Sequence, residues 1–189
     1  EVTTVENPFG QVLVALITPF HADGEVDWAA TERHIEHCIT SGADGIVVTG
    51  TTGETSTLTD PEKLELVRVA KSVSAGRAKI ITGGGSNETA HAIQLYKDSE
   101  KAGADGVMIV TPYYNKPPQA GILAHFNKLA DNVDLPVMLY DIPARTGTAI
   151  EWETLVQLAE HRNIMAVKDA KGDLESVVEV LRRTDLVWY

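Results

Sequence analysis

Cysteine, long apolar runs and positive charge are all scarce in this sequence. Cys38 is the only cysteine among 189 residues, which excludes a disulfide within the chain and favours a cytoplasmic location. No apolar run approaches the roughly 20 residues of a membrane-spanning helix, and residues 1–6 lack the basic start and apolar centre of a signal peptide. The net charge is −11, with 27 Asp and Glu against 16 Lys and Arg. We therefore expect neither nucleic acid nor a membrane as a partner.

Short apolar runs recur along the chain at intervals of about thirty residues, the length of one strand–helix unit. Each is flanked by turn residues, and the length of the chain suits one domain with a sizeable core. The predicted strands are 12–17, 45–49, 79–82, 106–111, 136–140, 164–168 and, as the chain stops, 186–189.

The segments between these runs carry helix signals. Asp27 is a predicted N-cap, and Thr59 opens a capping box with Glu62. In the second helix we expect Leu64, Val67 and Val73 to line the buried face. The remaining predicted helices are 86–102, 119–130, 151–160 and 174–183.

Alternating strands and helices predict a parallel sheet, built either as a doubly wound open sheet or as a (β/α)₈ TIM barrel. An open sheet would favour a glycine-rich fingerprint after the first strand, where residues 18–21 read Thr-Pro-Phe-His. The even repeat, echoed by Gly-Ala-Asp-Gly at 42–45 and 103–106, favours the barrel, with glycine ending each preceding helix. Residues 1–189 would then be the N-terminal portion of a single barrel domain, truncated after the sixth strand–helix unit at the start of the seventh strand. If they are the whole polypeptide, exposed strand edges predict poor solubility or association.

Polar side chains gather where the predicted strands end, which is where barrels place their active sites. Lys168 ends the sixth strand and is either a paired cation or a nucleophile with a lowered pKa, and its strand alone favours the pair. The hydroxyl groups at the other strand ends reverse that order, which leaves Asp169 and Lys171 as the local turn and its charge balance. Each neighbouring motif also has a plain structural interpretation. Gly-Thr-Thr-Gly-Glu at 50–54 is an anion-binding loop or a tight turn. The glycines at 83–85 leave room for a bulky neighbour.

The loops after the fourth and fifth strands add tyrosines and an arginine to this set. Tyr113 and Tyr114 suit packing or an interface, Tyr140 has a hydroxyl that needs a partner, and Arg145 is a carboxylate clamp or a surface charge. A lysine converging with hydroxyl groups suits imine chemistry, in which a neutral amine attacks a ketone. A metal site is disfavoured, because His34 and His37 lie on an outer helix and the other histidines are scattered.

Four motifs together resemble the dihydrodipicolinate synthase family, within the superfamily of Schiff-base aldolases. They are GTTGE at 50–54, VTPYYNKP at 110–117, LYDIPARTG at 139–147 and VKDAKGD at 167–173, in the family's order and spacing. The resemblance runs from about Gly10 to the last residue. It implies condensation of pyruvate with L-aspartate 4-semialdehyde in the lysine and diaminopimelate pathway, with no metal or organic cofactor.

The resemblance also implies roles for individual residues. Lys168 matches the lysine that forms a Schiff base with pyruvate, and Tyr140 matches the tyrosine that transfers protons. Thr51 and Tyr114 match the rest of a hydroxyl relay, with Tyr114 reaching a neighbouring subunit of a homotetrameric dimer of dimers. Thr52 matches the residue that holds the pyruvate carboxylate, and Arg145 matches the arginine that receives the carboxylate of the second substrate.

Two alternatives stay open at this point. One is a sibling pyruvate-dependent lyase acting on N-acetylneuraminate or a keto-sugar acid, which usually departs from the double threonine and the Arg-Thr pair. The other is a barrel that only binds a keto acid, or an inactive fragment. The retained lysine and hydroxyl residues argue against lost activity in the parent protein, but we expect the isolated 189 residues to be inactive.

Overall fold

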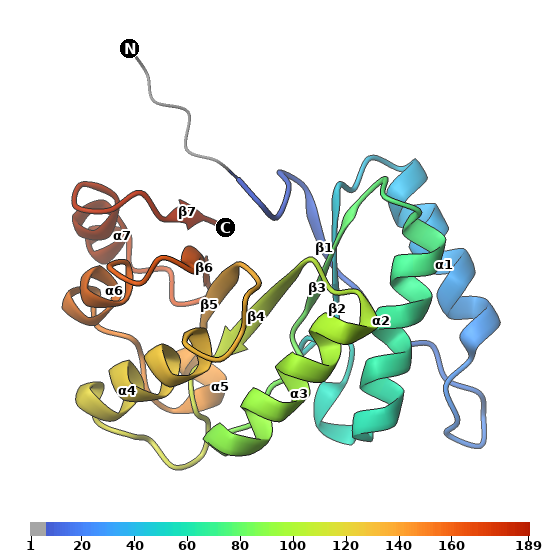
Figure 1. The fold of residues 1–189 in the computed structure, drawn as a ribbon, viewed down its shortest axis with the longest axis horizontal. Helices are drawn as coiled ribbons and strands as arrows, with labels where there is room; N and C mark the ends of the chain where they lie inside the picture. The colour runs from blue at the N-terminus through green and yellow to red at the C-terminus, as the bar shows by residue number, and fades with distance from the viewer. Residues whose placement is uncertain (1–6) are drawn as a thin grey trace. The chain divides into compact units, whose positions relative to one another are not determined.

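A computed structural model of the protein describes residues 7–189 (Figure 1). The segment 1–6, where the sequence shows no signal-peptide pattern, lies outside the described residues. Seven strands form one sheet in chain order. They are β1 Leu13–Ala15, β2 Gly45–Val48, β3 Lys79–Thr82, β4 Gly106–Val110, β5 Val137–Asp141, β6 Ile164–Asp169 and β7 Val187–Trp188.

The strand order settles the choice between the two architectures. Pairings from β1 to β4 and from β5 to β7 are all parallel, and each strand neighbours the next along the chain. A doubly wound sheet reverses its order at a switch point, whereas a (β/α)₈ barrel adds its strands in sequence. The chain therefore has the α/β barrel topology predicted above, through six strand–helix units and β7.

Helices fill the intervals between the strands. The longer ones are α1 Trp28–Thr40, α2 Asp60–Ser74, α3 Thr89–Ala102, α4 Gln119–Ala130, α6 Trp152–Leu158 and α7 Leu174–Leu181. Two short elements in strand-end loops, the 3₁₀ turn η1 Thr55–Thr57 and α5 Pro143–Thr146, were not predicted. None of the helices within residues 7–189 is both long and apolar enough to cross a membrane.

The two predicted helix caps are confirmed, α3 begins three residues later than predicted, and one predicted buried face is partly wrong. Asp27 accepts a hydrogen bond from the Ala30 N–H at 2.8 Å, and Thr59 and Glu62 form the capping box. On α2 only Val67 of the three predicted residues is fully buried; Leu64 and Val73 are half-buried. The buried residues of α2 are Lys63, Leu66, Val67, Ala70 and Ser74.

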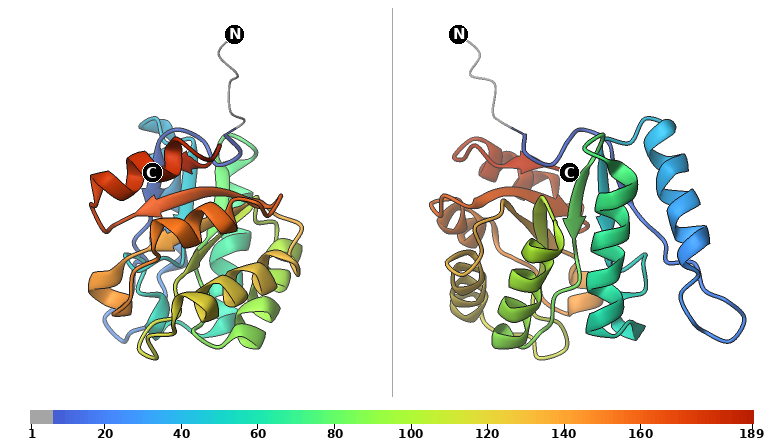
Figure 2. Two further views of the ribbon diagram at one scale, coloured as in Figure 1. Left: turned by 90° about the vertical axis from the view of Figure 1, so that its left-hand side faces the viewer. Right: turned by 45° about the vertical axis from the view of Figure 1, so that its right-hand side comes forward.

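The chain divides into two compact units, one of residues 8–84 with 95–107 and one of residue 7 with 85–94 and 108–189. Two of the boundaries, 94/95 and 107/108, fall within α3 and β4, and the single-domain interpretation stays a prediction. In the first unit α1 and α2 lie side by side, and α2 packs on β2 and β3 (Figure 2). In the second unit α6 contacts both α4 and α7, and β5 pairs with β6.

The repeated Gly-Ala-Asp-Gly sequence has a structural role beyond the predicted helix ends. Gly42 and Gly103 adopt φ of 107° and 106°, as a glycine that ends a helix requires. The aspartates then hold the preceding strand of the repeat. Asp44 accepts hydrogen bonds from the N–H groups of residues 11 and 12 before β1, and Asp105 accepts one from the Ile80 N–H of β3 at 2.9 Å. Each carboxylate thus fixes the amino-terminal end of a strand pair, opposite to the end that carries the polar loops.

Candidate active site

Lys168 and Tyr140 lie side by side at the carboxyl ends of two paired strands. Residues 140 and 168 are direct partners in the β5–β6 register. The Lys168 Nζ lies 4.3 Å from the centroid of the Tyr140 ring. Tyr140 is 5% exposed and Lys168 is half-buried. The strand–strand pairing therefore places an amine directly against a phenol.

The Lys168 amine is not held by an ion pair. Within residues 7–189 no carboxylate lies within 4.0 Å of its Nζ. Burial lowers the pKa of Lys168 below its ordinary value of 10.5, because the charged form loses solvent. The paired-cation alternative is therefore wrong for these residues, and the remaining one is an amine made easier to deprotonate.

Tyr140 is fixed through its backbone from both sides. Its carbonyl oxygen accepts hydrogen bonds from the N–H of Thr111, at 3.3 Å, and from the Thr111 hydroxyl, at 3.4 Å. On the other side Tyr140 pairs with Lys168. Its own hydroxyl makes no hydrogen bond to another residue in the described part of the chain. The phenol is thus held in place while its O–H stays available to a ligand.

The Gly-Thr-Thr-Gly-Glu segment forms the turn between β2 and η1, in the other compact unit. The N–H groups of Gly53 and Glu54 donate to the carbonyls of Gly50 and Thr51 at 3.1 Å. A Cβ at Gly53 would lie 2.9 Å from the Leu16 carbonyl oxygen, so this position requires glycine. The Gly53 carbonyl also accepts a 2.7 Å hydrogen bond from the Thr18 hydroxyl. Thr51 and Thr52 are left exposed at the tip of this anchored turn.

Thr49, which the sequence did not single out, sets the start of that turn. Its φ is 58°, a left-handed conformation that costs a β-branched residue about 1–2 kcal/mol. Its hydroxyl donates to the Val48 carbonyl at 2.6 Å and lies 3.2 Å from the Thr82 hydroxyl. It also accepts the N–H of Gly83 at 3.3 Å. Gly84 is tightly packed here, since a Cβ would lie 3.0 Å from the Thr49 hydroxyl oxygen, which explains one of the three glycines after β3.

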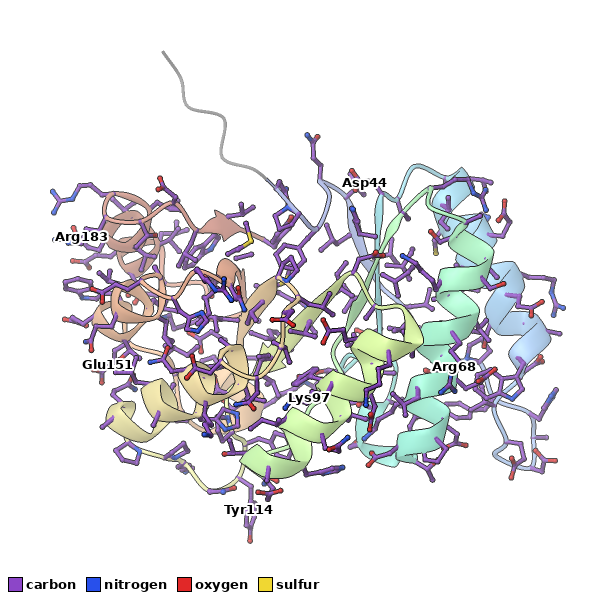
Figure 3. The ribbon with its side chains drawn as sticks, viewed as in Figure 1. Asp44, Arg68, Lys97, Tyr114, Glu151 and Arg183 are labelled. Atoms are coloured by element: carbon purple, nitrogen blue, oxygen red, sulfur yellow. The ribbon has the colours of Figure 1, made fainter. Side chains whose placement is uncertain are left out.

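Tyr114 lies in the loop after β4 and extends away from the rest of the chain (Figure 3). Its side chain is 91% exposed, and its φ is 75°. Its N–H donates to the Thr146 carbonyl at 3.3 Å, which ties this loop to α5. Tyr114 and Tyr140 are therefore not brought into contact within one chain, and an exposed tyrosine in a strained conformation is available to something outside it.

Arg145 is carried by the short helix α5, directly after β5. Its guanidinium is exposed and makes no hydrogen bond or ion pair to the part of the chain that the structure describes. The supporting residue is Thr146, whose buried hydroxyl donates to the carbonyls of Thr148 at 2.8 Å and Ile142 at 3.2 Å. Arg145 is thus a free cation on a rigid turn.

Lys171 departs from the prediction. Asp169 does form the local turn, because its Oδ1 accepts the N–H groups of Lys171 at 2.7 Å and Gly172 at 3.3 Å. The Lys171 ammonium, however, lies 3.4 Å from Asp141 on the neighbouring strand and donates to the Ile150 carbonyl at 3.1 Å. The Lys171 charge is therefore balanced by Asp141 at the end of β5 and not by Asp169 in its own turn. Sequence spacing alone does not reveal this contact.

The donor groups suit organic substrates better than a metal. Within residues 7–189 no three His, Cys, Asp or Glu side chains lie together as a metal site would need. The second unit instead places the Tyr140 phenol near the end of β5, the Lys168 amine near the end of β6 and the Arg145 guanidinium on α5. Such groups can bind a keto acid through an imine and a second carboxylate through an ion pair.

The chain matches the Dihydrodipicolinate synthetase family over residues 8–189. It is 56% identical over 182 residues to the 4-hydroxy-tetrahydrodipicolinate synthase of Acidothermus cellulolyticus, covering 96% of this chain and 59% of the relative. It is 49% identical over 187 residues to 4-hydroxy-tetrahydrodipicolinate synthase 2 of Streptomyces coelicolor, covering 99% of this chain and 62% of that protein. The chain thus spans about three-fifths of the length of these curated relatives.

Solved structures agree with these relatives. The lysine-bound enzyme of Cyanidioschyzon merolae, described as DHDPS, superposes with a TM-score of 0.95 at 48% identity, covering 97% of this chain and 64% of that one. The dihydrodipicolinate synthase of Acinetobacter baumannii, solved in complex with pyruvate, superposes with a TM-score of 0.89 at 40% identity, covering 94% and 62%. Both sequence identities are too high for the similarity to be one of fold alone.

Proposed function

Because the chain belongs to the dihydrodipicolinate synthetase family, we propose that the protein condenses pyruvate with L-aspartate 4-semialdehyde to 4-hydroxy-tetrahydrodipicolinate. The reaction is a step of lysine and diaminopimelate biosynthesis. The observation that carries the proposal is Lys168, an unpaired amine with a pKa lowered by burial, 4.3 Å from the Tyr140 ring. Relatives named for this activity and a neighbour solved with pyruvate support it.

The first half of the reaction is imine formation at Lys168. The neutral Nζ attacks the C2 carbonyl of pyruvate, and the carbinolamine loses water as Tyr140 supplies a proton to the departing oxygen. Thr52 holds the pyruvate carboxylate, and Thr51 and Tyr114 continue the proton relay from Tyr140. Loss of a proton from the pyruvate methyl group then gives an enamine.

The second half joins the two substrates. The enamine carbon adds to the aldehyde of aspartate semialdehyde, whose carboxylate is bound by Arg145. The amine of that substrate then attacks the imine carbon and displaces the Lys168 Nζ, which closes the six-membered ring. Holding both substrates on one lysine makes the carbon–carbon bond-forming step effectively unimolecular. Each step is completed by side chains, without a metal or organic cofactor.

Borohydride trapping tests this proposal. The full-length protein is incubated with pyruvate and borohydride, and peptide mass spectrometry should find a reduced pyruvate adduct on Lys168. Lys168→Arg keeps the charge but cannot form the imine, so this variant should give no adduct. An unmodified Lys168 in the wild-type protein would refute the mechanism. Aspartate semialdehyde should then be consumed in preference to sugar aldehydes, which separates this activity from that of the sibling lyases.

The exposed Tyr114 supports a shared active site, and we place the protein in the cytoplasm as a dimer of dimers. In this arrangement Tyr114 completes the relay of a neighbouring subunit. Tyr114→Phe and Lys168→Arg should each be nearly inactive, and mixing the two after dissociation should restore activity. Hybrid dimers would then hold one site with both groups intact. If the mixture stays as inactive as its components, Tyr114 does not act across the interface.

A further inference from the structure

Asp141 and Lys171 form a nearly buried ion pair next to the two proposed reactive groups. Asp141 is the last residue of β5, directly after Tyr140, and Lys171 lies three residues after Lys168 in the loop that follows β6. Their side chains are 2% and 16% exposed, and the Lys171 Nζ lies 3.4 Å from the Asp141 Oδ2. Neither residue belongs to the catalytic set derived above.

Ile150, just before α6, completes the arrangement. Its N–H donates to the Asp141 Oδ1 at 3.2 Å, and its carbonyl accepts from the Lys171 Nζ at 3.1 Å. Burial raises the pKa of the Asp141 carboxyl, and the Ile150 N–H and the Lys171 charge act against that rise. Three segments that follow one another around the sheet are therefore joined at one point.

The pair closes the end of the strand ladder that carries Tyr140 and Lys168. Residue 141 pairs with residue 169, and the Ala170 N–H donates to the Asp141 carbonyl at 2.9 Å. Beyond this point the β5–β6 ladder has ended, and the Asp141–Lys171 ion pair adds a side-chain contact that holds the departing loop to β5. A terminal pair that loosens would let the last residues of the ladder separate.

Because side chains alternate along a strand, the Asp141–Lys171 pair does not contact the Lys168 amine itself. Neighbouring residues of a strand point to opposite faces, so Asp141 and Asp169 face away from Tyr140 and Lys168. Asp169 is used by its own turn, and Lys171 neutralises Asp141.

We propose that Asp141 and Lys171 are a positioning pair, which keeps the Lys168 amine in register with the Tyr140 ring for imine formation. The proposal rests on the proposed function, in which Lys168 is the nucleophile. Misplacing a reacting group by about 1 Å costs on the order of a hundredfold in rate. The pair can therefore control the rate of attack on pyruvate without touching the substrate.

The test compares trapping rates in the full-length protein. Lys171→Met and Asp141→Asn should each slow borohydride trapping of pyruvate at Lys168 by about tenfold to a hundredfold, and lower kcat more than they raise the pyruvate KM. The double variant should recover part of the rate, because neither charge is then left buried without its partner. Lys71→Met is the matched control. It removes another lysine–aspartate pair, with 2.6 Å to Asp105 before β4, at the opposite end of the strands.

The control separates positioning from general loss of stability. Lys71→Met should lower the melting temperature and leave the trapping rate unchanged. If Lys171→Met and Asp141→Asn trap at the wild-type rate, or slow no more than a control of equal stability, the pair is only structural. Should Lys171→Met fail to fold, Asp141→Asn decides, since it keeps an acceptor for the Ile150 N–H. A wild-type protein that gives no adduct refutes the proposed function itself, a result distinct from a change confined to the variants.

Discussion

Acidification is expected to weaken the fold through His125, a buried imidazole on α4. The residue is 6% exposed, and its Nδ1 lies 2.9 Å from the Thr89 hydroxyl at the start of α3. Its ring packs edge-to-face on Phe126, with centroids 5.6 Å apart. The Nε2 is buried and has no hydrogen-bond partner within residues 7–189. Protonation would therefore leave a charged N–H without an acceptor.

The size of the effect follows from the pKa. Burial lowers the pKa of His125 from 6.5 to about 4, against a smaller upward effect of the Glu88 carboxylate. A folded-state pKa below the unfolded value means that the unfolded chain binds the proton first, so stability falls as the pH drops from 6.5 to 4. At about 1.4 kcal/mol for each pKa unit, the full loss is about 3 kcal/mol, and about 1 kcal/mol falls between pH 6 and pH 5.

Urea unfolding of the wild type and of His125→Asn, followed by circular dichroism from pH 7.5 to 4.5, measures this loss. Asparagine keeps a polar atom near the position of Nδ1 but does not titrate. The variant should be less stable at pH 7.5, and the wild type should lose its advantage as the pH falls. His37→Asn, at an exposed position on α1, should follow the wild-type slope. If the free energies of unfolding of the wild type and His125→Asn change in parallel with pH, the pKa of His125 is not lowered by burial and the prediction is wrong.

Three further outcomes are expected. The rate of pyruvate trapping at Lys168 should rise with pH through a midpoint below 10.5, because burial lowers the pKa of that amine; a midpoint at or above 10.5 would contradict this. Thr49→Val keeps the branched shape but removes the hydroxyl that accepts the Gly83 N–H, so urea unfolding should show a loss of about 1–2 kcal/mol, whereas an unchanged midpoint would mean that the strained residue needs no such support. Arg145→Met should raise the KM for aspartate semialdehyde by at least about tenfold and leave the pyruvate KM nearly unchanged in steady-state kinetics; equal effects on both would place Arg145 elsewhere in the reaction.

The strands were predictable because each is a short apolar run with a turn signal on either side. β3 agrees with its prediction at both ends, and β2 and β4 each end one residue early. The end of β5 was missed by one residue because Asp141 is charged, although its side chain is buried and paired. Local composition cannot show that pairing, since Lys171 lies thirty residues further along the chain.

The site was only partly predictable for a related reason. Lys168 and Tyr140 stand at the ends of apolar runs, so their type and place in the repeat were visible, and their pairing follows from the strand order. Thr49 was not visible, because a threonine gives no sign in sequence that its φ will be positive. The α5 turn was missed because four residues are too few to show helical periodicity.

The orientation of the nearby carboxylates explains why Lys168 has no ion-pair partner within residues 7–189. A lysine that follows an apolar run usually finds an acidic partner, and Asp169 is adjacent in sequence. The alternation of the strand turns Asp169 and Asp141 to the opposite face, where one caps its own turn and the other meets Lys171. Both acidic residues beside the site are thus occupied, which leaves the Lys168 amine unpaired. The alternation of side chains along the strand therefore separates the Lys168 amine from the neighbouring carboxylates.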